Sequence, residues 1–92
     1  MGITWDPTKE RKLLKDRGID VREIAELIME HRYVDILENP SRPEQYVFIL
    51  NYHGYIHVAP FVIAKDETIV LKTVYPSRRF HEIYGEHHEN QT

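Results

Sequence analysis

The sequence predicts an α+β domain: an N-terminal helical hairpin packed on an antiparallel, largely meander β-sheet, with a short C-terminal helix. The first third of the chain carries helix-capping residues and apolar residues at spacings of three and four. After His31, β-branched and aromatic runs alternate with turn residues. Ninety-two residues are enough for one core only. We therefore assign residues 1–84 to a single domain and residues 85–92 to a polar, flexible tail.

A first helix is expected after the short, β-prone run Ile3-Thr4-Trp5. Asp6 can cap its amino end and Pro7 suits the first helical position. Gly18 supplies a left-handed stop, so the helix ends at about Arg17. Because this helix has only two leucines to bury, we expect it to lie near the solvent.

A second helix follows at once, which makes a tight helical hairpin. Asp20 and Glu23 form a variant of the capping box at its start. Its apolar residues recur at helical spacing and predict a stripe that packs on the sheet. These residues are Val21, Ile24, Ala25, Leu27 and Ile28.

Four strands are expected next, near Tyr33–Leu37, Tyr46–Tyr52, Tyr55–Ile63 and Thr68–Tyr75. The turns His53-Gly54 and Ala64–Glu67 are short enough for antiparallel hairpins. Pro60 cannot donate to a ladder, so it implies an edge position or a bulge. Pro76-Ser77 then ends the sheet and starts a short helix from Arg78 to about Tyr84. These helices cover one face of the sheet, and the other face is expected to stay open.

The composition excludes several kinds of protein. No cysteine is present, which rules out disulfides and thiolate metal sites and fits a reducing compartment. The longest apolar stretch is interrupted by His57 and Pro60, and no secretory pattern opens the chain. We expect a cytoplasmic protein with no membrane association. The pairs His53/His57 and His87/His88 do not make a zinc site, so no metal and no cofactor are expected.

The net charge of −3 argues mildly against nucleic-acid binding, which normally rests on clustered Lys and Arg. The distribution of charge matters more than the sum. No acidic residue lies between Glu67 and Glu82, whereas Lys72, Arg78 and Arg79 do. A local positive patch is therefore compatible with an acidic protein.

Both ends of the chain carry a family resemblance. Trp5-Asp6-Pro7-x-Lys9, Arg17-Gly18-Ile19 and Pro76-Ser77-Arg78-Arg79 resemble the corresponding segments of BrnT-family toxins. The resemblance implies a compact fold related to RelE-type ribonucleases, metal-independent cleavage of RNA and inhibition of translation. It also implies a type II toxin-antitoxin system with a ribbon-helix-helix antitoxin as partner. A homodimer or a heterotetramer with the antitoxin would be the expected assembly.

The middle of the chain departs from that family. Family members commonly carry a Tyr-Thr-x-Arg turn where this chain reads Pro60-Phe61-Val62-Ile63-Ala64-Lys65. The missing arginine favours an alternative, a non-catalytic protein-interaction domain that acts with an antitoxin as a transcriptional corepressor. Self-association through an exposed edge strand is a third hypothesis.

Lys72, Arg78 and His57 are the candidate catalytic residues. Metal-free RNA cleavage needs a base for the 2′-hydroxyl and cations for the charge that gathers on phosphate. Regular strand alternation places Lys72 with Val70 and Val74 on the open face, opposite Leu71. An imidazole titrates near neutral pH, which makes His57 the preferred base, with His31 and His81 weaker candidates. The alternatives are a solvated lysine and a structural histidine.

The candidate RNA- or phosphate-binding residues lie at two places in the chain. Ser77 and Arg79, with Arg78, stand at the start of a helix, where backbone N–H groups help to bind anions. The first helix adds Arg11, Lys12 and Lys15 on adjacent positions. The alternatives are ion pairs between Glu82 and the two arginines, and a solvated helix face.

Overall fold

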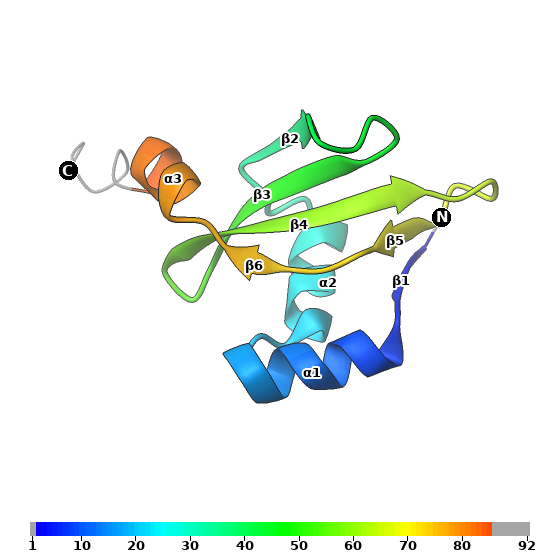
Figure 1. Ribbon diagram of the computed structural model, residues 1–92, viewed down its shortest axis with the longest axis horizontal. Coiled ribbons are helices and arrows are strands. Elements are labelled where there is room, and N and C mark those ends of the chain that lie inside the picture. Colours follow the sequence, from blue (N-terminus) through cyan, green and yellow to red (C-terminus); the bar gives the residue numbers. More distant parts are fainter. Residues whose placement is uncertain (1, 86–92) are drawn as a thin grey trace.

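A computed structural model of the chain describes residues 2–85. The helices are α1 (Pro7–Arg17), α2 (Val21–Met29) and α3 (Arg78–Phe80), and α3 continues as the π-helical turn η1 (His81–Gly85). The strands are β1 (Ile3–Trp5), β2 (Asp35–Glu38), β3 (Tyr46–Tyr52), β4 (Tyr55–Ile63), β5 (Ile69–Leu71) and β6 (Tyr75–Pro76). They form one sheet in the order β1-β5-β4-β3-β2, and β6 also pairs with β4 (Figure 1). The predicted α+β class and the helical hairpin are confirmed.

The sheet is mixed, because β1 pairs in parallel with β5. The other strand pairs are antiparallel. The expectation of a purely antiparallel sheet is therefore wrong at this edge. Ile3-Thr4-Trp5 was correctly expected to be extended, but a three-residue run carries no information about which distant strand it pairs with.

The caps of the two long helices follow from their sequences. The Asp6 side chain accepts a hydrogen bond from the Thr8 backbone N–H at 2.8 Å, and Gly18 takes the left-handed conformation with φ of 67°. Helix α1 buries no residue, as expected. Helix α2 buries its apolar stripe through Val21, Ile24, Ala25 and Ile28.

Two hydrogen-bonded links tie the helical hairpin to the sheet. The buried Tyr52 hydroxyl of β3 accepts from the backbone N–H of Asp20, the N-cap of α2, at 3.0 Å. Trp5 Nε1 of β1 donates to Glu10 Oε1 at 3.0 Å, and Glu10 forms an ion pair with Arg22 of α2 at 3.2 Å. These contacts fix where α1 and α2 lie over the sheet.

The sheet has a different hydrophobic cluster on each face. The helix-side cluster joins α2 to residues such as Phe48, Leu50 and Phe61. The cluster on the opposite face consists of Val47, Ile49, Ile56 and Val58, and Phe80 and Tyr84 pack against it. The expectation that this face is open is therefore only partly right, because α3 and η1 cover one end of it.

Tyr84 fastens η1 across this second face. Its hydroxyl donates to Asp35 Oδ2 of β2 at 3.2 Å. Partial burial, together with the Asp35 carboxylate, raises the pKa of Tyr84. The C-terminal turn is thus attached to the strand at the far edge of the sheet.

Pro60 of β4 has no backbone N–H to donate to a neighbouring strand. Strand β4 lies inside the sheet, so Pro60 is not at an edge. Its carbonyl accepts from Lys72 N–H at 2.8 Å. In extended backbone the N and C=O of one residue point to the same side, so the missing N–H of Pro60 also faces the segment after β5.

A bulge forms at that place. Phe61 pairs with Leu71 and Val58 pairs with Tyr75, so three residues, 72–74, lie opposite two residues of β4. The bulge expected from Pro60 is thus present, on the partner strand, and the predicted continuous strand Thr68–Tyr75 is wrong there. Because of the extra residue, Leu71 and Val74 both enter the helix-side cluster.

None of the helices in residues 2–85 is long and apolar enough to cross a lipid bilayer.

We expect Tyr52→Phe to lower the free energy of unfolding by about 1 to 2 kcal/mol, because it leaves a partly buried N–H of Asp20 without an acceptor. Urea denaturation at neutral pH measures this change. Tyr46→Phe is the matched control, since Tyr46 is 40% exposed and loss of its hydroxyl should cost less than about 0.5 kcal/mol. Equal effects of the two substitutions would contradict this role of the Tyr52 hydroxyl.

Candidate functional site

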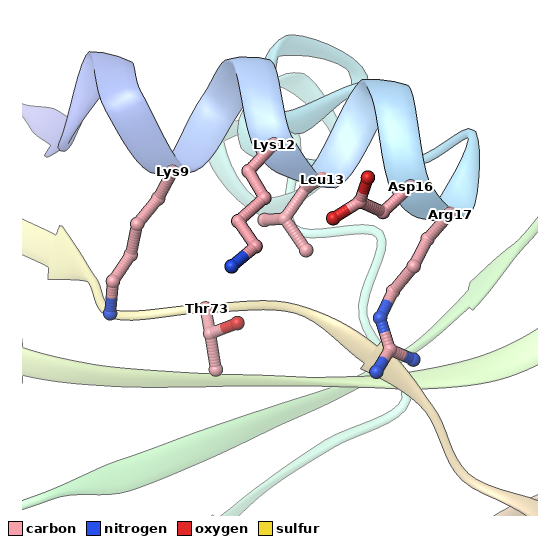
Figure 2. Close-up of a pocket in the computed structure, with 6 residues that line it drawn as sticks. All are labelled: Lys9, Lys12, Leu13, Asp16, Arg17 and Thr73. Carbon is pink, nitrogen blue, oxygen red and sulfur yellow. The ribbon is translucent and has the colours of Figure 1, made fainter.

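A groove of about 580 Å³ lies between helix α1 and the bulge that follows β5. Figure 2 shows Lys9, Lys12 and Arg17 extending from α1 toward the segment that carries Thr73. Leu13 and Asp16 complete the lining. Three basic side chains and one acidic side chain therefore line the groove.

The helix presents these residues together because of their spacing. Positions 9, 12, 13, 16 and 17 are separated by three and four residues, which places them on one face of an α-helix. Only Leu13 among them packs against the core. The long side chains on either side of it project past the core and reach the edge of the sheet.

A second groove of about 440 Å³ adjoins the first, and the two share Lys9 and Thr73. Its basic side chains are Lys9, Arg42 and Lys72. Neither an acid nor a histidine lines it. The remaining lining residues are Asn39, Ser41, Gln45, Pro60, Thr73 and Tyr75.

The loop between β2 and β3 brings Arg42 to this groove. Asn39 Oδ1 accepts from the Ser41 N–H at 3.0 Å, and the Arg42 N–H donates to the Asn39 carbonyl at 3.1 Å. The loop is closed by the Asn39 N–H, which donates to the Gln45 carbonyl at 3.1 Å. This tight, hydrogen-bonded turn fixes the position of Arg42 beside the bulge.

Lys9 connects the two grooves. Its ammonium donates to the carbonyl of Lys72 at 2.9 Å, a carbonyl that the bulge leaves without a strand partner. Lys9 and Lys72 are both exposed. The bulge that Pro60 causes therefore holds two cationic residues next to each other.

We call the five basic residues of the two grooves the cationic track: Lys9, Lys12, Arg17, Arg42 and Lys72. All five are exposed. Within residues 2–85 none of them forms an ion pair, since the three ion pairs there are Arg22–Glu10, Arg32–Glu30 and His53–Glu23. The charges of the track are thus available to an anionic ligand.

Tyr75 lines the second groove together with Lys72 and Arg42. It lies in β6 opposite Val58, which places its side chain on the face away from α1 and α2. The ring is 40% exposed. Tyr75 is the one hydroxyl-bearing aromatic residue among the residues that line the two grooves.

Two residues expected to act on phosphate, Lys72 and Lys12, lie in the track. Arg11 and Lys15 are exposed on α1 but line neither groove. The Arg11 guanidinium instead donates to Thr8 Oγ1 at 3.5 Å. Of the expected cluster of Arg11, Lys12 and Lys15, only Lys12 therefore lines a groove.

Ser77, Arg78 and Arg79 do not join Lys72 in its groove. The Ser77 hydroxyl caps α3, where it accepts from the Phe80 N–H at 3.2 Å. Both arginines are exposed. Lys72 shares its groove with Lys9 and Arg42 and not with Arg78.

His57 lies on the opposite side of the sheet from Lys72. It pairs with the buried Leu50, is only 7% exposed, and packs edge-on against Tyr52 with ring centroids 5.2 Å apart. Its Nδ1 is 2.9 Å from the carbonyl oxygen of Tyr55. Burial lowers the pKa of His57. A buried, neutral imidazole on the helix side does not reach the track, so the structure does not bring the three expected catalytic residues together.

The weaker histidine candidates are also remote from the track. His81 Nδ1 accepts from the Ile56 N–H at 3.2 Å, and its ring stacks on Tyr55 at a centroid distance of 4.1 Å. His31 lines an apolar groove at the end of α2. No group of three or more His, Cys, Asp or Glu side chains in residues 2–85 gathers as a metal site, and His87 and His88 lie outside the described residues.

Sequence reasoning missed Lys9, Arg17, Arg42 and Tyr75. The first two were detectable, because they complete the three-and-four spacing with Lys12 along α1. For Arg42 and Tyr75 no local signal exists. Their approach to Lys72 depends on the β2–β3 loop and on the bulge.

No protein-family model matches the chain, and no curated protein sequence matches it. The crystal structure of the Brucella abortus ribonuclease toxin BrnT is similar to this structure, with a TM-score of 0.64. The match covers 84% of this chain and 96% of that chain at 17% sequence identity. The chain has the BrnT fold. The resemblance seen at both ends of the sequence is thereby confirmed for the architecture of the BrnT fold, and the departure in the middle agrees with the low identity.

We expect acidification to destabilise the protein in part through His57. Because burial lowers the pKa of this imidazole below its usual 6.5, the unfolded chain binds its proton first. Its contribution to stability is complete above about pH 6.5 and is lost as the pH falls through that value toward the folded-state pKa. Urea midpoints measured between about pH 7.5 and pH 5.5 should fall for the native chain and fall less for His57→Phe. Parallel pH profiles of the two proteins would contradict a buried, neutral His57.

Proposed function

We propose that the protein is a ribonuclease toxin that binds RNA along the cationic track. The observation that carries this proposal is the gathering of five exposed, unpaired basic residues on a chain whose net charge is −3. A phosphodiester backbone is the ligand that such a row of cations suits best. The fold similarity to a ribonuclease toxin supports the same proposal.

Binding of RNA gains free energy from the release of counterions, and each Lys or Arg that neutralises a phosphate contributes. The track offers cations from α1, from the bulge and from the β2–β3 loop. Side-chain amides and hydroxyls of Asn39, Ser41 and Gln45 line the same groove. They supply neutral hydrogen bonds for the sugar hydroxyls.

For cleavage, the proposal assigns distinct roles to residues of the second groove. A base takes the proton of a 2′-hydroxyl, the 2′-oxygen attacks phosphorus, and the 5′-oxygen leaves with a proton. Lys72 and Arg42, with Lys9 beside them, stabilise the charge on the phosphate oxygens. We propose that Tyr75 donates its phenolic proton to the leaving 5′-oxygen, while a water molecule takes the proton of the 2′-hydroxyl.

The reaction proposed here needs no metal and no cofactor. His57 takes a structural role on the helix side of the sheet, where it packs against Tyr52. Arg78 and Arg79 stay as proposed secondary contacts to phosphates outside the groove.

In its cellular setting, we propose that the protein is a cytoplasmic toxin that inhibits translation and is held inactive by an antitoxin of the ribbon-helix-helix type. The resemblance at both ends of the chain and the BrnT fold support this assignment. A homodimer or a heterotetramer with the antitoxin is the assembly that we propose.

One observation favours the second candidate function, a non-catalytic protein-interaction domain that acts with its antitoxin as a transcriptional corepressor. Neither an acid nor a histidine lines the groove that holds Lys72, so catalysis depends on Tyr75 or on a lysine as the proton-transfer group. Whether the protein is an enzyme therefore depends on whether one such side chain transfers a proton.

Purified protein incubated with RNA tests the proposal. We expect cleavage that persists in EDTA, and we expect Tyr75→Phe to lower the cleavage rate by about 100-fold or more while RNA affinity stays unchanged. Cleavage by Tyr75→Phe at the rate of the native chain would contradict the proposed role of the phenol. The absence of any cleavage, with or without EDTA, would favour the non-catalytic alternative.

We expect the salt dependence of RNA binding to identify the track. For a single-stranded RNA, Lys72→Gln and Arg42→Gln should each reduce the slope of log affinity against log salt by about 0.7, between about 50 and 200 mM salt. Lys15→Gln is the matched control, because Lys15 is exposed on α1 but lies outside the track. A larger change for Lys15→Gln than for Lys72→Gln would contradict the proposed path of the RNA.

A further inference from the structure

A third groove, of about 400 Å³, lies on the helix side of the sheet beyond the end of α2. Its lining is almost entirely apolar: Ile28, Met29, His31, Tyr33, Ile36, Tyr46, Phe48, Phe61, Ile63 and Ile69. Helix α2 ends at Met29 and therefore leaves the far ends of β2, β3 and β4 uncovered. We call this surface the apolar groove.

The apolar groove gathers side chains that normally avoid water. Met29, Ile36, Tyr46 and Ile63 are between 40% and 51% exposed, and all four line it. They are half of the eight large hydrophobic residues that are exposed to this degree in the described part of the chain. A contiguous exposed apolar surface of this kind marks an interaction site.

An unpaired strand edge borders the apolar groove. Within residues 2–85, β2 pairs with β3 alone. Ile36 of β2 lies opposite Phe48 of β3, so its side chain is on the groove side. A strand added at the free edge of β2 would place every second side chain over the groove, beside Ile36.

The charges around the apolar groove are mainly acidic. Glu38 lies opposite Tyr46 and therefore at the rim on the same face. Asp66 and Glu67 belong to the turn that joins Ile63 to Ile69. Lys65 lies in the same turn and is outnumbered by these two acids and Glu38. Glu30 forms an ion pair with Arg32 at 3.8 Å and lines a different groove.

The same acids disfavour a second copy of this chain as the occupant. Full antiparallel overlap of two β2 strands sets Asp35 opposite Glu38 of the other copy, and like charges at such positions destabilise a strand pair. Each copy also brings its own acidic rim and a net charge of −3. The complementary occupant is a basic segment.

We propose that the apolar groove docks a strand from a partner protein in which apolar residues alternate with basic residues. The strand pairs with the free edge of β2, its apolar side chains enter the groove, and its basic side chains meet Glu38 and the neighbouring acids. This docking surface is separate from the cationic track, which shares none of its lining residues with the apolar groove. The proposal does not depend on RNA binding or cleavage.

The test uses synthetic fluorescent peptides of about six residues, the usual length of a strand. One peptide alternates Lys with Ile and Val, a second has the same composition with its lysines grouped at one end, and a third replaces every Lys by Glu. We expect the alternating basic peptide to bind the full chain at least about tenfold more tightly than either of the others, by fluorescence anisotropy. Equal binding of the alternating and grouped peptides, or no binding of the alternating one, would overturn the proposal.

Variants locate the peptide. We expect Ile36→Lys to weaken binding of the alternating peptide by about tenfold or more, and Glu38→Lys to weaken it through charge. Leu14→Lys is the matched control, because Leu14 is 56% exposed on α1 and lies outside the apolar groove. An unchanged affinity for Ile36→Lys would contradict this site.

Two further measurements test whether a second copy of the chain occupies the groove and whether Ile36→Lys is folded. Light scattering over a range of concentrations should report one chain for the native protein, and a dimer abolished by Ile36→Lys would overturn the proposal in favour of a second copy as occupant. The circular dichroism spectrum of Ile36→Lys should equal that of the native chain, which shows that the variant is folded. Loss of peptide binding with an unchanged spectrum therefore tests the apolar groove alone.

Discussion

The missing N–H of Pro60 is the constraint on which the rest of the candidate site depends. Strand β4 is central in the sheet, and a proline in such a strand leaves one ladder position without a donor. The neighbouring chain segment forms a three-residue bulge, in which the Lys72 N–H still donates a hydrogen bond to the Pro60 carbonyl. The bulge changes the alternation, so that Val74 joins Leu71 in the helix-side core. It also leaves the Lys72 carbonyl to accept from Lys9, and this contact joins the two halves of the cationic track.

The division of charges explains how an acidic chain can bind an anion. Two acidic residues bind side chains of the protein itself. Glu10 accepts a hydrogen bond from Trp5 and forms an ion pair with Arg22, and Asp35 accepts a hydrogen bond from Tyr84. The cations of the track are left without such partners in the described part of the chain. Because exposed charges beyond about 10 Å are largely screened at ordinary salt, the local excess of cations matters more to a bound phosphate than the net charge. The acidic rim of the apolar groove belongs to a different surface and suits a different ligand.

Much of the fold could be predicted from local signals. The caps Asp6, Gly18 and Asp20 and the turn at His53-Gly54, where both residues have positive φ, determined α1, the start of α2 and the β3–β4 hairpin to within a residue. The site was harder to predict, because it depends on register. A shift of one residue at the bulge moved Val74 to the other face, and the pairing of His57 with Leu50 placed the expected base on the helix side. Arg42 and Tyr75 reach Lys72 only through tertiary structure, so no spacing in the sequence could reveal them.

The proposed function requires RNA to lie on the cationic track. Titration of isotope-labelled protein with a short single-stranded RNA, made resistant to cleavage by 2′-O-methylation, tests it most directly. We expect backbone amide shifts to concentrate in α1, in residues 39–45 and in residues 72–75, with small changes in α3. Shifts concentrated at Arg78 and Arg79, or spread evenly over the surface, would contradict it.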